Sequence, residues 1–121
     1  MNNKGNHLIV DIYNIGEEKL KDIKSAKKLL KDLSEKIGAR SIGKPVVKKI
    51  TSINSLNWGI SGFILLCESH IALHTWPENN YAAMDIYHCK NFNKDKINKT
   101  VYYLKKYWGS DKIKIKILIR G

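Results

Sequence analysis

Apolar residues recur along the chain at two different spacings, and the change from one spacing to the other marks the expected elements. Runs rich in valine, isoleucine and aromatic residues, bounded by glycine, asparagine and proline, are typical of β-strands. Such runs cover residues 7–13, 41–50, 60–69, 70–76, 81–89 and 112–120. The last run, KIKIKILIR, alternates between lysine and isoleucine, which predicts a strand with a polar and a buried face at a sheet edge.

Two further segments carry apolar residues every three or four positions, the spacing of an amphipathic helix. The first segment, 17–37, is followed by Gly38, and glycine is the residue that most often follows the end of a helix. Its apolar face consists of Leu20, Ile23, Leu30, Leu33 and Ile37. The second segment, 93–108, has an apolar face made of Ile97, Val101, Leu104 and Trp108.

The elements follow one another in the order β-α-β-β-β-β-α-β, with a polar loop at 51–59 and a turn at 77–80. Strands joined by short turns pair antiparallel, and a sheet buries one face against helices. We therefore expect an α+β fold, a two-layer sandwich with a mainly antiparallel sheet and two helices on one face. The other face of the sheet is left over, which favours a homo-oligomer.

Length and composition restrict the class of protein. A chain of 121 residues with 43% hydrophobic residues builds one domain with its own core, residues 1–121. No apolar run reaches the roughly 18 to 20 residues that span a bilayer, and the N-terminus lacks the features of a signal peptide. Two cysteines are too few for a disulfide framework. We expect a cytoplasmic protein with no membrane partner.

A formal charge of +11 raises the alternative of a lysine-rich nucleic-acid-binding module. Only Arg40 and Arg120 are arginines, although arginine is the residue best suited to bidentate contacts with bases and phosphates. The lysines are spread over several predicted solvent faces. A solvated lysine-rich surface is the simpler interpretation, and we keep nucleic-acid binding as the alternative.

Reactive side chains gather in CESHIALHTWPE, residues 67–78. A metal site is the first possibility, because His70 and His74 share one side of a predicted strand. Four positions along a strand separate their Cα atoms by about 13 Å, which one metal ion cannot bridge. The sequence therefore predicts no metal site.

A cysteine near a serine is the second possibility, and strand pairing tests it. If the turn at 77–80 closes a hairpin, Trp76 pairs with Tyr81 and His70 pairs with Tyr87. Continued by two residues, this register places Cys89 opposite Glu68 and Ser69. We therefore expect a thiol beside the Glu68–Ser69 peptide bond.

ESHIALHTWPE, followed by YAAMDIYHC, resembles the bacterial and archaeal S-adenosylmethionine decarboxylases, the small pyruvoyl-dependent enzymes of polyamine synthesis. The resemblance extends to the opening GNHLIVDIYN, the helix that ends in IGA, the ISG before Glu68, and the last helix and strand. It covers nearly the whole chain.

The resemblance implies that the chain cuts itself between Glu68 and Ser69, into a β chain, 1–68, and an α chain, 69–121. The Ser69 hydroxyl would attack the Glu68 carbonyl, and elimination from the resulting ester would leave a pyruvoyl group on the α chain. His74 matches the family's processing base, which removes the α-proton. Ser61 matches a serine that assists processing. A dimer of αβ units would follow.

The resemblance also implies how a small-molecule substrate is decarboxylated. The pyruvoyl group made from Ser69 would form a Schiff base with the substrate amine and accept its electrons, with no pyridoxal phosphate and no metal. Cys89 matches the proton donor. Glu78 matches the acidic residue that binds the ribose hydroxyls, a role suited to a carboxylate.

One segment, KKITSINSLNWGISG, departs from the family, because the F-x-P-x-G that usually precedes the ISG is absent. The aromatic residue of that motif stacks on adenine in the family, and Trp58 is the substitute that this sequence offers. An altered loop also fits a pyruvoyl-dependent arginine or ornithine decarboxylase. We predict conversion of S-adenosylmethionine to decarboxylated S-adenosylmethionine for spermidine synthesis, with arginine or ornithine as the alternative substrate.

Overall fold

The structure is a computed structural model that describes residues 5–51, 57–89 and 92–121. Its helices and strands follow one another in the predicted order, with an additional short helix after the first strand. In chain order they are β1 (Gly5–Ile12), α1 (Glu17–Leu20), α2 (Ile23–Lys36), β2 (Ser41–Thr51), β3 (Trp58–Leu66), β4 (His70–Trp76), the 3₁₀ turn η1 (Pro77–Asn79), β5 (Tyr81–His88), α3 (Lys94–Trp108) and β6 (Ile113–Arg120).

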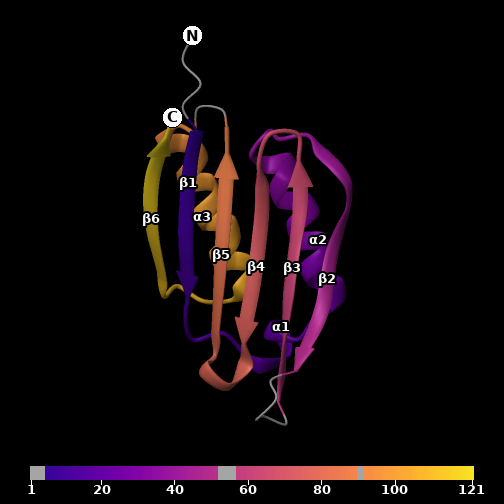
Figure 1. The fold of residues 1–121 in the computed structure, drawn as a ribbon. Coiled ribbons are helices and arrows are strands. Elements are labelled where there is room, and N and C mark those ends of the chain that lie inside the picture. The colour runs from indigo at the N-terminus through magenta and orange to yellow at the C-terminus, as the bar shows by residue number, and fades with distance from the viewer. Residues whose placement is uncertain (1–4, 52–56, 90–91) are drawn as a thin grey trace.

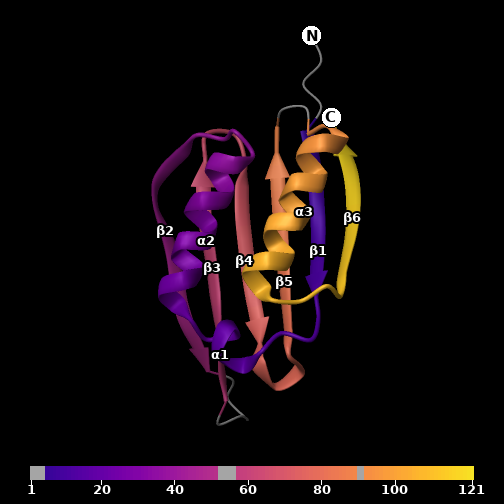
Figure 2. The same ribbon diagram turned by 180° about the vertical axis from the view of Figure 1, so that it is seen from behind.

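Within the described residues the strands form one sheet in the order β2-β3-β4-β5-β1-β6, with every neighbouring pair antiparallel. The strand β6 lies at an edge, as its alternating sequence predicts. Figures 1 and 2 show α2 and α3 side by side on one face of the sheet, with the opposite face uncovered. The expected α+β two-layer sandwich is confirmed.

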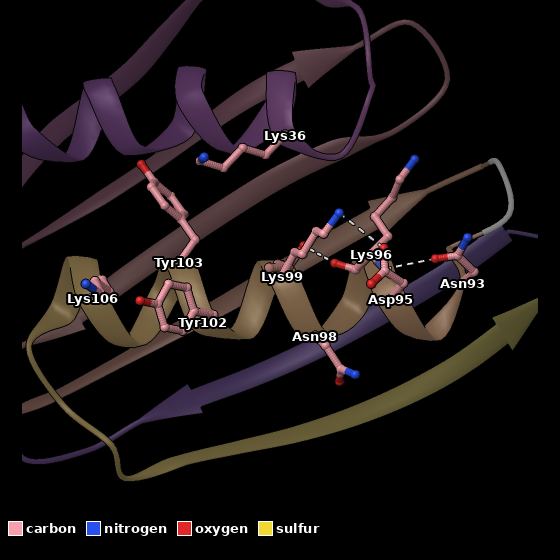
Figure 3. Close-up of a pocket in the computed structure, with 10 residues that line it drawn as sticks. Lys36, Asn93, Asp95, Lys96, Asn98, Lys99, Tyr102, Tyr103 and Lys106 are labelled. Atoms are coloured by element: carbon pink, nitrogen blue, oxygen red, sulfur yellow. Dashed lines mark hydrogen bonds and ion pairs between the residues drawn. The ribbon is translucent and has the colours of Figure 1, made fainter.

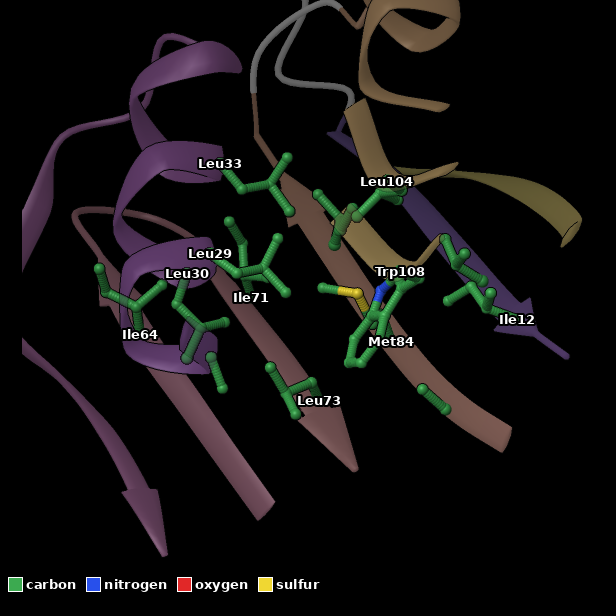
Figure 4. Packing of buried hydrophobic residues seen from close by; sticks show 14 of the residues in the cluster. Ile12, Leu29, Leu30, Leu33, Ile64, Ile71, Leu73, Met84, Leu104 and Trp108 are labelled. Atoms are coloured by element: carbon green, nitrogen blue, oxygen red, sulfur yellow. The ribbon is translucent and has the colours of Figure 1, made fainter. Parts of the chain in front are cut away.

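The core lies between the sheet and the two long helices (Figure 4). Strand residues alternate between the helix side and the uncovered side, so every second residue of the central strands is buried. Large side chains that meet in this layer include Ile12, Leu29, Leu30, Leu33, Ile64, Ile71, Leu73, Met84, Leu104 and Trp108, none of which is more than 2% exposed.

The first predicted helix, 17–37, is wrong as one continuous element, because the chain breaks it between Leu20 and Ile23. Asp22 takes an extended conformation there, and its carboxylate accepts a hydrogen bond of 2.9 Å from the Ser25 backbone N–H. An aspartate in this position satisfies an amide that would otherwise lack a partner at the start of a helix. The apolar spacing continues across the break, so periodicity alone does not reveal it.

The boundaries around the reactive stretch also differ from the prediction. The strand β3 already begins at Trp58, inside the predicted loop 51–59, and ends at Leu66 instead of residue 69. Residues 52–56 of that loop lie outside the described residues. The turn at 77–80 is present as η1, closed by Asn80 in the left-handed conformation at φ 50°.

The uncovered sheet face, called the open face below, carries an apolar patch over β2, β3 and β4. Register places Val46 beside Phe63 and Ile42 beside Leu65 on this face. Together with Ile50 and Trp76, these side chains are between 38% and 50% exposed. A contiguous apolar surface of this kind marks an interaction site.

Candidate active site

The turn between β3 and β4 holds the peptide bond that the sequence singled out. The Leu66 backbone N–H donates to the Ser69 carbonyl at 3.0 Å, which closes the turn. The Cys67 backbone N–H donates to the Arg40 carbonyl at 3.0 Å and ties the turn to the segment that leads into β2. Ser69 is 8% exposed, whereas Cys67 and Glu68 are exposed.

Cys89 reaches this turn from the end of β5. The predicted hairpin register is confirmed, since Trp76 pairs with Tyr81 and His70 pairs with Tyr87. The thiol of Cys89 donates a hydrogen bond of 3.0 Å to the Glu68 carboxylate. Both residues line a cavity of about 270 Å³, together with Gly38, Ala39, Arg40, Cys67, Ser69 and His88.

Ser61 and His74 form a second pair, on the open face. They are direct partners across β3 and β4, and the Ser61 hydroxyl lies 2.8 Å from His74 Nδ1. A hydroxyl bonded to an imidazole can exchange a proton with it, which suits general acid–base chemistry. This pair, with Trp76 and Glu78, lines a cavity of about 170 Å³.

Local packing fixes β3 against β4 at this second cavity. The Thr75 hydroxyl donates to the Leu20 carbonyl at 2.7 Å and accepts the Ile60 backbone N–H at 2.9 Å. A Cβ atom at Gly59 would lie 2.3 Å from the Thr75 carbonyl oxygen, so only glycine allows this close approach. The strands are thereby held at the spacing that brings Ser61 to His74.

The two groups of side chains lie at opposite ends of β4. Ser69 precedes the strand and His74 is five positions further on, a separation of about 16 Å at the usual rise of a strand. In Figure 1 the β3–β4 turn lies at one end of the sheet and the β4–β5 turn at the other. Within one chain, therefore, the Ser61–His74 pair does not reach the Glu68–Ser69 bond.

The structure also separates Trp58 from the second cavity. Trp58 is on the helix side of β3, packed against the core, with the Lys49 and Lys21 ammonium groups 4.8 and 5.5 Å from its ring centroid. The aromatic residue that does line the cavity is Trp76, which the sequence analysis did not select. The alternation along HTW could have identified it, because residues 74 and 76 share a strand face.

Beside Trp76, a row of polar and aromatic groups continues along the open face. The ring of Tyr81 stacks on Trp76 with centroids 5.2 Å apart, and its hydroxyl donates to the Asp11 carboxylate. Burial, followed by the hydrogen bond and the negative charge of Asp11, raises the pKa of Tyr81 to about 12. Tyr81 is therefore a neutral phenol at any physiological pH. Further along the row, His7 Nε2 lies 3.0 Å from the Asp85 carboxylate.

A larger cavity, about 610 Å³, lies on the helix layer, away from these groups (Figure 3). Figure 3 shows lysines from α2 and α3 around it, with Tyr103 facing Lys36 across the gap. The Lys36 ammonium is 4.7 Å from the centroid of the Tyr103 ring, and Lys99 pairs with Asp95 at 3.2 Å. Some lysines of the chain thus make contacts with other side chains of the protein. None of the predicted catalytic residues lines this cavity.

The arrangement of acidic, histidine and cysteine side chains and the length of the helices bear on metal binding and membrane spanning. Among residues 5–51, 57–89 and 92–121, no group of three or more His, Cys, Asp or Glu side chains is arranged to hold a metal ion. In the same part of the chain, no helix has the length and apolar character needed to cross a membrane.

Comparison with known proteins identifies the family of this chain. The family described as S-adenosylmethionine decarboxylase matches residues 6–121. The S-adenosylmethionine decarboxylase proenzyme of Thermodesulfovibrio yellowstonii is 37% identical over 86 residues, which cover 70% of this chain and 58% of that protein. A proenzyme of the same name from Clostridium botulinum is 33% identical over 122 residues, covering 100% of this chain and 97% of that protein.

One solved structure supports the fold. The crystal structure of the adenosylmethionine decarboxylase from Aquifex aeolicus superposes with a TM-score of 0.79, over 100% of this chain and 93% of that chain. The two sequences are 23% identical, so this similarity concerns the fold.

Proposed function

The chain belongs to the S-adenosylmethionine decarboxylase family of carboxy-lyases, and on this premise we propose that it is a self-processing, pyruvoyl-dependent enzyme. It cuts itself between Glu68 and Ser69 and converts S-adenosylmethionine to decarboxylated S-adenosylmethionine and CO₂. The product is the aminopropyl donor for spermidine. The observation that carries this proposal is the contact between Cys89 and Glu68 at the turn before Ser69.

Self-cleavage uses side chains of the protein itself and one water molecule. The Ser69 hydroxyl attacks the Glu68 carbonyl carbon, and the peptide bond becomes an ester. Loss of the Ser69 α-proton then breaks the bond between Cβ and the ester oxygen, which frees the Glu68 carboxylate and leaves dehydroalanine. Water hydrolyses its imine form, releasing ammonia and leaving a pyruvoyl group at residue 69. The turn suits this chemistry, because Ser69 is nearly buried beside a cavity that gives access to the bond.

The base that removes the α-proton is His74 of a second copy of the chain. Within one chain His74 is about 16 Å from Ser69, too far for proton transfer. In a dimer whose open faces pack together, a two-fold axis that runs across the strands reverses their direction. The Ser61–His74 end of one sheet then lies over the Glu68–Ser69 end of the other. Sheets packed face to face are about 10 Å apart, so side chains from both meet between them.

The apolar patch of the open face supports this dimer. Phe63 and Leu65 are 46% and 48% exposed on the same strand as Ser61. Two copies of one patch form a self-complementary interface, the commonest arrangement in homo-oligomers. Each dimer would contain two equivalent sites, and each site would use side chains of both copies.

In decarboxylation, the second reaction, the residues of the site have separate roles. The pyruvoyl group supplies the electron sink that decarboxylation of an amino acid requires. The Cys89 thiol stands beside residue 69 and delivers a proton to the substrate carbon. The Glu78 carboxylate, at the other cavity, accepts hydrogen bonds from two ribose hydroxyls. Trp76 lines the same cavity and offers an aromatic surface to the adenine.

Two measurements test the proposal. Intact mass under reducing conditions is expected to give two chains, 1–68 and 69–121, the second carrying a ketone in place of the serine amine. Ser69→Ala is the matched control and stays uncut, because it has no hydroxyl. A wild-type chain that remains full-length after prolonged incubation would refute self-cleavage.

The substrate is tested separately, by release of labelled CO₂ from carboxyl-labelled S-adenosylmethionine, arginine and ornithine. We expect release from S-adenosylmethionine alone, since arginine and ornithine have no ribose for Glu78. Release from arginine or ornithine, and none from S-adenosylmethionine, would leave self-cleavage standing and overturn the substrate.

A further inference from the structure

Both cysteines of the chain line the same cavity at the processing turn, and the proposed reaction uses only one of them. Cys89 is the proton donor. Cys67 precedes the cut bond by one residue, is exposed, and lines the cavity of about 270 Å³ that Cys89 and Glu68 also line. Neither cysteine is in a disulfide.

In the uncut chain the turn holds the two thiols apart. Cys67 directly follows β3 and Cys89 directly follows β5; β4 lies between these two strands, and each step between neighbouring strands is about 4.8 Å. The backbones are therefore about 10 Å apart, whereas a disulfide requires Cα atoms within about 7 Å. The hydrogen bonds from Cys67 to Arg40 and from Leu66 to Ser69 keep the turn in place.

Cleavage changes this restraint. Once the Glu68–Ser69 bond is cut, Cys67 and Glu68 are the last two residues of the β chain. Their only covalent attachment is through Leu66, and one backbone hydrogen bond, from Cys67 to the Arg40 carbonyl, remains to be broken. The gap to be closed is about 3 Å, and one residue of free chain spans up to about 3.5 Å. Rotation about Leu66 also withdraws the Glu68 carboxylate from Cys89, which leaves that sulfur accessible to a second thiol.

We propose that Cys67 and Cys89 form a reversible disulfide in the cleaved enzyme, and that this bond switches decarboxylation off by consuming the thiol that donates the proton. The inference rests on the proposed function in two respects, the self-cleavage at Glu68 and the role of Cys89. Cys67 is then a site of redox modification, and the oxidant that it reacts with is a hydroperoxide.

The reaction balances with that co-reactant. The exposed Cys67 sulfur attacks the peroxide oxygen, giving a sulfenic acid and releasing an alcohol, or water when the peroxide is hydrogen peroxide. The Cys89 sulfur then attacks the Cys67 sulfur and displaces water. The two thiols lose two electrons and two protons in total, and the peroxide is reduced. A dithiol reverses the bond by exchange and restores the Cys89 thiol.

The test compares cleaved wild-type enzyme with Cys67→Ser, both treated with hydrogen peroxide at a low molar excess. Intact mass without reductant is expected to show the wild-type α and β chains joined, two hydrogens lighter than their sum. Its activity falls by at least about tenfold and returns with dithiothreitol. Cys67→Ser has normal activity before treatment and never joins its chains. It loses activity only at peroxide doses that oxidise Cys89 beyond the sulfenic acid, and dithiothreitol does not restore that loss.

Uncut Ser69→Ala is the control for the role of cleavage, and its disulfide is expected to form at least about ten times more slowly, because the intact turn holds the thiols apart. Equal rates would overturn that role. Cleaved wild-type chains that stay separate after oxidation, with both thiols open to iodoacetamide, would overturn the disulfide and leave self-cleavage intact. A product that joins two β chains would overturn it as well, since Cys67 would then pair between copies. A chain found uncut under reducing conditions would refute the self-cleavage and the switch together.

Discussion

At the scale of single residues, the proposed roles divide between two short contacts. The Cys89 thiol donates to Glu68 at the processing turn, and Ser61 pairs with His74 at the other end of β4. Each contact joins a residue capable of proton transfer to a neighbour that orients it. Substitutions at the two contacts should therefore stop the enzyme at different stages.

His74→Ala is expected to stall processing at the ester. The Ser69 hydroxyl can still attack the Glu68 carbonyl, but elimination lacks its base. Hydroxylamine cleaves esters and not ordinary peptide bonds, so it should split the stalled protein into pieces of the sizes expected for cleavage before Ser69. Ser69→Ala treated in the same way should stay intact. If hydroxylamine leaves His74→Ala whole, the histidine acts before the ester forms.

Trp76 and Trp58 are a matched pair for substrate binding, because the first lines the cavity of Glu78 and the second packs under the helices. Loss of one stacking surface costs roughly 1–3 kcal/mol, about a 5- to 150-fold change in affinity. We expect Trp76→Ala to raise the KM for S-adenosylmethionine on that scale and Trp58→Ala to act mainly on thermal stability. The reverse result in steady-state kinetics and thermal melts would return the stacking role to Trp58.

Tyr81 predicts a pH dependence of stability. Its folded-state pKa is raised to about 12 from an ordinary value of 10.0, so the unfolded chain loses this proton first as the pH rises. The stabilisation is fully present below pH 10 and is lost between about pH 10 and 12. Tyr81→Phe should weaken the fall in unfolding free energy over that window, measured by urea titration at several pH values. An unchanged slope in Tyr81→Phe would show that other groups cause the fall, such as Tyr103 and Tyr107, whose pKa values burial also raises.

At the scale of elements, short polar signals decide where helices and strands start. Asp22 separates α1 from α2, and the side chain of Asn93 accepts the Lys96 backbone N–H at the start of α3. Such caps determine boundaries that hydrophobic spacing leaves undefined. The break after α1 also matters for the site, because the Leu20 carbonyl at the end of α1 accepts the Thr75 hydroxyl that braces β3 against β4.

Asp22→Ala should destabilise the protein by about 1 kcal/mol, the usual cost of losing a helix cap. Asp22→Asn is the matched control and retains most of the cap, since the amide oxygen accepts the same hydrogen bond. The Ser25 amide and hydroxyl lower the pKa of Asp22, so the wild-type advantage over Asn should disappear as the pH falls below 3.8 and the carboxylate is protonated. Urea titrations at pH 7 and pH 3 measure both effects, and equal stability of the Ala variant at pH 7 would contradict the capping role.

At the scale of the whole molecule, each active site is expected to combine two copies of the chain. The reason is the distance along β4, which keeps Ser69 and His74 of one chain apart, together with the apolar open face that a second copy can cover. The proposed dimer would thus serve the chemistry as well as bury apolar surface.

Co-expression of Ser69→Ala with His74→Ala tests this arrangement. Neither variant completes processing alone, but a mixed dimer contains one site with an intact Ser69 from one copy and an intact His74 from the other. Random pairing makes about half of the dimers mixed, so roughly a quarter of all sites should become processed and active. Quantitative mass spectrometry of the cut chains measures that fraction. Complete absence of cutting in the mixture would place the whole site within one chain.

The sequence by itself determined the six strands and the two long helical segments, their order and the β4–β5 register, although not every boundary. Period-two and helical spacings identify the buried faces, and the turn at 77–80 leaves one hairpin pairing that matches them. For that reason the position of Cys89 beside Glu68 could be predicted from strand counting. The same stretch, ESH followed by HTWPE, also carries the family resemblance.

Only the tertiary structure decided which of the other reactive groups meet. The pairing of Ser61 with His74 depends on the turn after Leu66, where the predicted strand continued to residue 69. The sheet face on which Trp58 lies depends on where β3 begins. The sequence predicts a loop for this segment, and a loop has no defined alternation of side-chain directions. Spacing along a chain fixes the faces of its elements, because side-chain direction is a local property of the backbone. The meeting of distant groups depends on how the ends of those elements are placed, which only the packed molecule specifies.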